Sequence, residues 1–272
     1  MANQMQASLD IGWLALALFM LVLLVPLGIG RLFNLKLGGE MLLAAARMTA
    51  QLLLVGFYLK FLFSLESLWV NLLWLSVMLL VGTSAILGGA RLPKARLMLP
   101  LLFSLSVSLL PLLALLLLAL LQPSPVYQAQ YMIPLAGMLL GNSLSGNILA
   151  LQRLFNAFEE KQEDYQGRLA LGATPWQAAF PFIQGALQQA LAPSIAAMST
   201  MGLVTLPGMM TGQILGGSDP LVAVKYQVVI MLAIMVMLSM SVASALSLAV
   251  RQCLNHSGKL LIKRVESIKN SY

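Results

Sequence analysis

A run of small and polar residues interrupts a strongly apolar part of the sequence at residues 202–216. Pro207 cannot donate the helical hydrogen bond to the carbonyl of Leu203, and the adjacent Gly208 adds backbone freedom, so we expect a helix to kink or break there. A helix broken at membrane depth exposes carbonyl oxygens, which is how many transporters coordinate cations. The side chains beside the break that could add ligands are Thr205, Met209, Met210, Thr211 and Gln213. The sequence therefore predicts a substrate path at this break.

Met209 and Met210 carry thioether sulfur, which is a soft ligand for a metal ion. Methionine is also the usual filler of irregular apolar gaps, and most of the 17 in this chain are expected to be filler. The pair beside the break is the exception, and we assign it as a candidate metal site.

Two further pairs of polar residues lie within other apolar runs: Asn142 with Asn147, and Arg47 with Gln51, which are one helical turn apart. Such side chains are costly against lipid, so they should face other helices or a wet path. Helix packing and substrate contact both stay open for the asparagines. For Arg47, reaching back to the membrane surface is the competing interpretation.

A helix–turn–helix signal lies at residues 169–178. Gly172 suits the left-handed residue that closes a helix, Thr174 an N-cap, Pro175 the first helical position and Gln177 the partner of a capping box. The pattern predicts a helix, a tight turn and a short helix that carries Trp176. A short capped helix with an aromatic residue is a good shape for docking to a partner protein, while anchoring at the lipid headgroups is the alternative.

The elements that must position these residues are membrane-spanning helices. Of the residues, 60% are hydrophobic and only 9% charged, against roughly a quarter charged in a soluble domain. Apolar runs long enough to cross a bilayer are found at 9–30, 41–63, 68–87, 98–121, 131–151, 193–215 and 221–250. Pro111 and Pro207 lie inside two of these runs and predict kinks or breaks. We predict an all-α polytopic membrane protein with about seven spans.

The basic residues fix the expected orientation. With alternate loops assigned to opposite sides, one side receives thirteen of the sixteen basic residues: Arg31, Lys36, Arg91, Lys94, Arg96, Arg153, Lys161, Arg168, Arg251, Lys259, Lys263, Arg264 and Lys269. This bias predicts a cytoplasmic carboxyl terminus and an amino terminus outside.

One segment should extend into the cytoplasm within the single permease domain 1–272, at residues 152–192. Its first part has apolar residues on one helical face, namely Leu151, Leu154, Phe155 and Phe158. The predicted fifth span therefore continues out of the membrane as an amphipathic helix. The four carboxylates that follow, from Glu159 to Asp164, are expected to form a solvated helix face.

Several function classes are disfavoured. The net charge of +7 comes from residues between the apolar runs, where it indicates topology and not nucleic-acid binding. Cys253 and His256 are too few for a zinc site, and the sequence has no phosphate-binding Gly-x4-Gly-Lys-Ser/Thr loop, so we expect no cofactor in this chain. A protease inside the membrane would need paired aspartates or a serine–histidine pair, which the spans lack.

The sequence resembles the FetB-type permeases, a family that includes the plant aluminium-sensitivity ABC permeases. The resemblance rests on the block at 206–215, which reads Leu-Pro-Gly-Met-Met-Thr-Gly-Gln-Ile-Leu, and on the stretch at 169–174. It extends to Asp219-Pro220, Tyr226-Gln227, Gly137-Met138, Gly141-Asn142 and Arg47 with Gln51, and so covers most of the chain.

This resemblance implies the membrane subunit of an ABC transporter in the cell inner membrane. The chain itself would not be an enzyme: a separate cytoplasmic ATPase would bind ATP and Mg²⁺, and two permeases would pair with two ATPases. Bacterial members are associated with iron export and plant relatives with aluminium tolerance, and UDP-glucose has been proposed as a substrate. The residues similar to an ABC coupling loop are Leu171, Gly172, Ala173, Thr174, Pro175, Trp176 and Gln177. A secondary transporter or channel for a cation or small solute is the alternative, although no Asp or Glu lies mid-span to couple ions.

Overall fold

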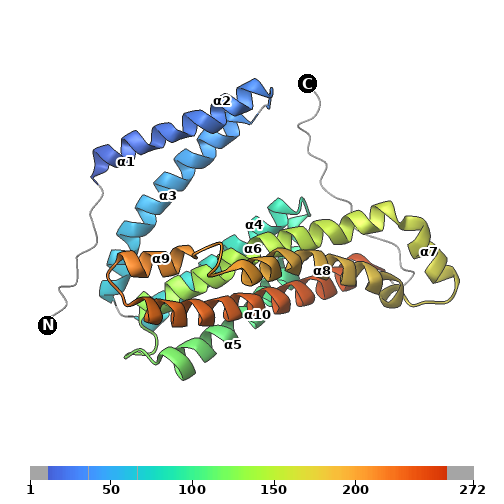
Figure 1. The fold of residues 1–272 in the computed structure, drawn as a ribbon. Helices are drawn as coiled ribbons and strands as arrows, with labels where there is room; N and C mark the ends of the chain where they lie inside the picture. Colours follow the sequence, from blue (N-terminus) through green and yellow to red (C-terminus); the bar gives the residue numbers. More distant parts are fainter. Residues whose placement is uncertain (1–11, 36, 66, 256–272) are drawn as a thin grey trace.

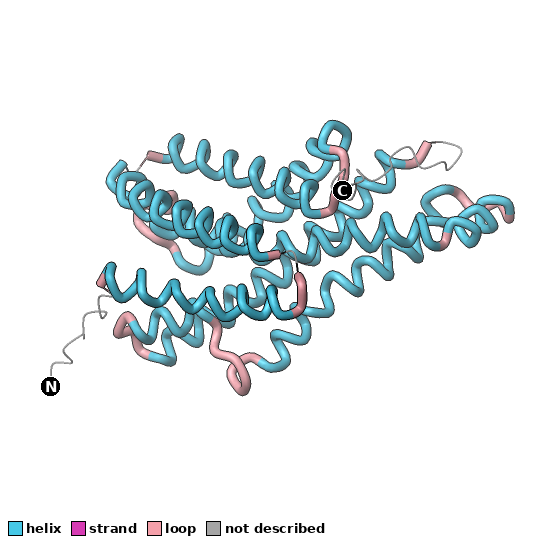
Figure 2. Tube along the Cα trace, turned by 90° about the horizontal axis from the view of Figure 1, so that it is seen from above, coloured by secondary structure: helices cyan, strands magenta, loops and turns pink. Residues whose placement is uncertain are grey.

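The computed structural model describes residues 12–35, 37–65 and 67–255. In Figure 1 they form a bundle of long helices and a helical hairpin that stands at an angle to it. Helices and short loops make up this described part of the chain, which contains no named strand (Figure 2). The predicted all-α class is confirmed. Four basic residues near the carboxyl terminus, Lys259, Lys263, Arg264 and Lys269, lie outside the described residues, as do Lys36 and His256.

The hairpin and the bundle follow one another in sequence. The hairpin consists of α1 (Trp13–Phe19), η1 (Met20–Leu23), α2 (Leu24–Leu32) and α3 (Gly38–Leu65). The bundle consists of α4 (Leu68–Gly89), α5 (Lys94–Leu115), η2 (Leu116–Leu121), α6 (Ala129–Glu160), α7 (Gln162–Ala170), α8 (Pro175–Thr200), α9 (Gly208–Leu215) and α10 (Pro220–Cys253).

Six helical segments of the described residues are long and apolar enough to cross a membrane, so the chain is a polytopic membrane protein. They correspond to six of the seven predicted spans. The remaining span, expected at 193–215, is divided because α8 ends at Thr200 and α9 begins at Gly208. The predicted break at Pro207 is therefore confirmed. At Pro111 the helix does not break, because α5 continues to Leu115 and passes into the π-helix η2 at Leu116.

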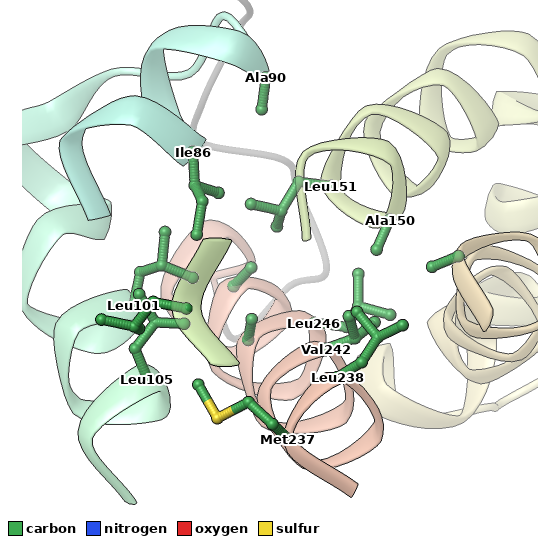
Figure 3. Packing of buried hydrophobic residues seen from close by; sticks show 14 of the residues in the cluster. Ile86, Ala90, Leu101, Leu105, Ala150, Leu151, Met237, Leu238, Val242 and Leu246 are labelled. Atoms are coloured by element: carbon green, nitrogen blue, oxygen red, sulfur yellow. The ribbon is translucent and has the colours of Figure 1, made fainter. Parts of the chain in front are cut away.

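The core of the bundle lies between α4, α5, α6 and α10 (Figure 3). Ile86, Leu105, Leu151 and Leu246 contribute side chains to it that are almost fully buried. A glycine at 146 allows α6 and α10 to approach closely, because a Cβ there would overlap the side chain of Leu238. Helix packing thus joins these helices into one body.

Several small residues of α6 and α9 do not pack against another helix of the same chain. A Cβ added at Gly141, Gly208 or Gly212 would meet nothing within 4 Å, and Ser145 is exposed. These positions of α6 and α9 therefore lie on the outside of the bundle.

The bundle has two distinct ends. One carries α7 and the turn into α8, and we call it the elbow end; the other carries α9, and we call it the break end (Figure 1). Helix α8 runs antiparallel to α10, because Trp176 lies against Arg251 near the elbow end and Met201 lies against Gln227 at the break end.

Candidate transport site and coupling elbow

The elbow between α7 and α8 is closed by backbone and side-chain hydrogen bonds. Ala173 N–H donates to the Arg168 carbonyl and Gly172 N–H to the Leu169 carbonyl, with Gly172 at φ +91°. This is the pairing of a Schellman motif, in which glycine takes the left-handed position. The α7 helix therefore ends where the sequence predicts.

The start of α8 has the predicted capping box. Thr174 N–H donates to Gln177 Oε1 at 2.9 Å, and Gln177 N–H donates to Thr174 Oγ1 at 3.3 Å. Pro175 occupies the first helical position, where its missing N–H costs nothing. The local geometry of the elbow is thus fixed by its own residues.

We expected a short helix after the elbow, but α8 is 26 residues long. The sequence interpretation ended at residue 178, although apolar residues continue at helical spacing beyond it. The buried residues of α8 are Ala178, Ala179, Phe182, Ile183, Ala186 and Ala190. Because this face packs on α6, the helix stays ordered from the elbow to Thr200.

The side chains at the elbow point in two directions. Leu171 is 90% exposed at the turn and Phe180 is 45% exposed. Trp176 is half-buried instead, with the guanidinium of Arg251 5.6 Å from its ring centroid. This cation–π contact places Trp176 between α8 and α10, so the residue offered outward is Leu171, not Trp176.

An aromatic cluster joins the elbow to α6. The Phe158 ring meets Tyr165 of α7 and Phe182 of α8 edge to face, at centroid distances of 5.2 and 5.3 Å. Leu151, Leu154 and Phe158 are buried as predicted for the face of the extended α6. Burial also raises the pKa of Tyr165. A movement of the elbow therefore acts on the end of α6 as well as on α8, because both helices contact this cluster.

The break between α8 and α9 is a compact loop. Gly202, at φ +84°, donates its N–H to the Thr205 carbonyl at 2.9 Å, and Val204 N–H donates to the Thr200 carbonyl at 3.0 Å. Pro207 is the N-cap of α9, and Thr211 Oγ1 donates to its carbonyl at 3.1 Å. Thr205 is exposed at this loop.

The other predicted residues of the break occupy α9. Met209 is half-buried and packs against the core, and Met210 is half-buried too. The Oε1 of Gln213 is buried without a hydrogen-bond partner. Within the described residues no group of three or more His, Cys, Asp or Glu could hold a metal ion. Any cation held here would rely on neutral oxygen and sulfur atoms.

Gln227 of α10 lies at the break and was not among the predicted site residues. Its side chain is buried, with Nε2 donating to Met201 Sδ at 3.9 Å and Oε1 left without a partner. The sequence signals were a glutamine in the apolar first third of a span and its place in the Tyr226-Gln227 pair of the resemblance, and the fold was needed to place it beside the end of α8.

The two predicted asparagines have different surroundings. Asn147 is fully buried, and its Nδ2 donates to the Ser143 carbonyl and to Ser241 Oγ, both at 2.9 Å. Ser104 Oγ donates to the Ser241 carbonyl at 2.8 Å, so the network links α5, α6 and α10. The structure places Asn147 in helix packing.

Asn142 faces the outside of the bundle, where its Nδ2 donates to the Met138 carbonyl at 2.8 Å. It lies on the α6 surface that also carries Gly141 and Ser145. Asn142 is thus a polar side chain presented outward by a helix of membrane-spanning hydropathy, whereas Thr205 is exposed on the loop between α8 and α9.

Arg47 and Gln51 are exposed on α3 of the hairpin. The hairpin meets the bundle near Leu62, which is buried with Ala129 and Ile133 of α6. Arg47 lies fifteen residues earlier, about 22 Å along the helix axis. Within one chain, the structure does not bring these two residues to the break.

Comparison with known proteins places the chain among membrane proteins. The family model described as "Uncharacterised protein family (UPF0014)" matches residues 13–254. A UPF0014 membrane protein of Synechocystis is 36% identical over 255 residues, covering 93% of this chain and 96% of the relative. Protein ALUMINUM SENSITIVE 3 of Arabidopsis thaliana is 35% identical over 80% of this chain and 77% of its own length. The probable iron export permease protein FetB of Escherichia coli is 30% identical over 93% and 96%. No solved structure matches the chain significantly.

Proposed function

The chain belongs to the UPF0014 family of membrane proteins, and we propose that it is the membrane-spanning subunit of an ABC transporter that exports a metal cation. A separate cytoplasmic ATPase supplies the energy, and two permeases pair with two ATPases. Iron is the first candidate substrate, because the Escherichia coli relative bears the name of a probable iron export permease. The elbow end faces the cytoplasm of a cell whose inner membrane holds the protein.

The observation that carries this proposal is the continuity of α8. One helix runs from the capped elbow at Thr174 to the break after Thr200, about 39 Å. A displacement of the elbow is therefore carried to the break by one helix, in which Pro181 and Pro193 are the two interior positions that lack a backbone N–H donor. This connection is what a permease driven by a cytoplasmic partner requires.

The elbow has the features of a docking site for the ATPase. The Schellman turn and the capping box hold Gly172 and Thr174 in a fixed shape, so little entropy is lost on binding. Leu171 projects from this turn and is 90% exposed. A rigid turn with an apolar tip matches a groove in the partner.

The substrate path runs along the outward-facing part of α6 and the loop between α8 and α9. Asn142 and Thr205 are exposed there, and lipid offers no hydrogen bonds to such groups. The open space beside Gly141 and Gly212 allows another backbone to approach closely. A second copy of the chain facing this surface closes the path, which agrees with the two-plus-two assembly.

The buried groups without partners favour a cation as the substrate. The buried side-chain atoms that lack a hydrogen bond among the described residues are all amide oxygens, those of Asn71, Asn147, Gln213 and Gln227. Oxygen acceptors stabilise positive charge and repel phosphate. The unpaired oxygens of Gln213 and Gln227, at the break end, therefore favour a cation over a nucleotide sugar.

The test is reconstitution of the chain with an ABC ATPase that co-purifies with it. ATP hydrolysis stimulated by Fe²⁺, together with ATP-dependent Fe²⁺ movement in proteoliposomes, is the expected result. Thr174→Pro and Trp176→Ala should uncouple hydrolysis from transport, whereas Met209→Ala, Met210→Ala and Asn142→Ala should weaken transport alone. Transport by the purified chain driven by an ion gradient, with no ATPase bound, would instead identify a secondary transporter.

A further inference from the structure

Helix α8 is attached to α10 by a polar contact at each end. At the elbow end, Arg251 covers the ring of Trp176, and at the break end Gln227 Nε2 donates to Met201 Sδ. Between these contacts α8 is one uninterrupted helix up to Thr200. A displacement of the elbow along α8 should therefore change the contact between Met201 and the buried amide of Gln227.

Gln227 uses only part of its hydrogen-bonding capacity. Its side chain is 6% exposed, its amide N–H meets a thioether, which is a weak acceptor, and its Oε1 has no partner. A leucine or methionine would fill the same space without a buried unpaired oxygen. A glutamine in this position indicates a role other than packing.

The helix that packs on α10 at the break end carries a second buried amide oxygen without a partner. This atom is Oε1 of Gln213 in α9. Amide oxygens without carboxylates bind a cation weakly, which suits an ion that must leave again.

We propose that Gln227 is a cation ligand at the break end of the path, and that Met201 is the latch which holds its amide group in the conformation described. When the elbow displaces α8, Met201 leaves Gln227 Nε2, and the side chain can turn its amide oxygen toward a metal cation in passage. This inference rests on the proposed function and identifies a contact that the sequence did not predict.

Three variants of the full permease–ATPase complex test the ligand, with Fe²⁺ as the probe. Gln227→Leu should raise the Fe²⁺ concentration that gives half-maximal ATPase stimulation by about tenfold, and should leave thermal stability unchanged or higher. Gln227→Glu should lower that concentration and slow turnover, because a carboxylate holds the cation more tightly. Met240→Leu, on an exposed part of α10, is the matched control and should change neither value.

The ligand role is overturned if Gln227→Leu leaves the half-maximal concentration unchanged and alters only thermal stability. That result would assign Gln227 to packing. Failure of Fe²⁺ to stimulate the wild-type complex is a different outcome, because it refutes the proposed substrate and with it the ligand role.

The latch is tested without any substrate. In a chain with Cys253→Ala, which removes the one cysteine, the pair Met201→Cys and Gln227→Cys should cross-link with a short bifunctional thiol reagent. Addition of the ATPase, ATP and vanadate should reduce the yield at least several-fold. An equal yield with and without nucleotide would refute the latch, even if the complex transports iron.

Discussion

Truncation of Leu171 should weaken ATPase binding without harming the permease itself. The side chain is 90% exposed at the elbow, so the isolated chain gains almost no stability from it. Full burial of a leucine contributes about 1.5–3 kcal/mol. Since alanine retains the Cβ, we expect Leu171→Ala to cost about 1.5–2 kcal/mol of binding, or roughly 10–30-fold in Kd.

The assay is titration of the detergent-solubilised permease with its ATPase, together with a thermal melt of the permease alone. Leu203→Ala is the matched control, because that leucine is 91% exposed at the break, the opposite end of the bundle. Leu171→Ala should shift Kd and leave the melt unchanged, and the control should shift neither. If the two variants bind the ATPase equally well, the elbow is not the docking site.

Three further changes separate the roles of neighbouring residues. Thr174→Ala removes the hydroxyl that accepts from Gln177 N–H and should destabilise the first turn of α8 by about 1 kcal/mol, visible as faster amide hydrogen exchange there. Gly172→Ala should impair coupling of hydrolysis to transport, since alanine is strained at φ +91°, whereas Gly185→Ala, in a helix with open space around it, should be neutral or stabilising. Asn147→Ala should lower the melting temperature, at a cost of about 1–2 kcal/mol, while Asn142→Ala should spare stability and reduce transport in proteoliposomes.

Local sequence signals predicted the features that depend on neighbouring residues only. The cap at Thr174, the left-handed Gly172 and the break at Pro207 follow from backbone chemistry within a few residues, and the structure contains all three. Hydropathy likewise predicted six of the spans. Each of these rules holds whatever the rest of the chain does.

Features that depend on what lies across a helix interface were not accessible in this way. Asn142 and Asn147 are the same residue type in one helix, but five residues rotate the chain by about 140° at 3.6 residues per turn. One therefore faces outward while the other meets Ser241 of α10. Gln227 was not predicted as a site residue for the same reason, because its contact with Met201 of α8 crosses a helix interface.

The length of α8 was missed for a different reason. The capping signals at Thr174 and Gln177 mark where a helix starts and say nothing of where it ends. The helix is long because its alanines continue the buried face against the bundle as far as Ala190. Exposed polar residues between these alanines, such as Gln188, make the apolar face of α8 hard to recognise from sequence.

The two kinds of interface in the bundle suggest which part moves. Helices α5, α6 and α10 are joined by directional hydrogen bonds at Ser104, Asn147 and Ser241, which break if the helices slide. Four of the six buried residues of α8 are alanines, and small side chains form low ridges that oppose sliding less. In a shear motion, packed helices slide past one another by small amounts, which an interface of small side chains permits. A force on the elbow should thus move α8 along a fixed frame, with the loop between Thr200 and Gly208 absorbing the displacement.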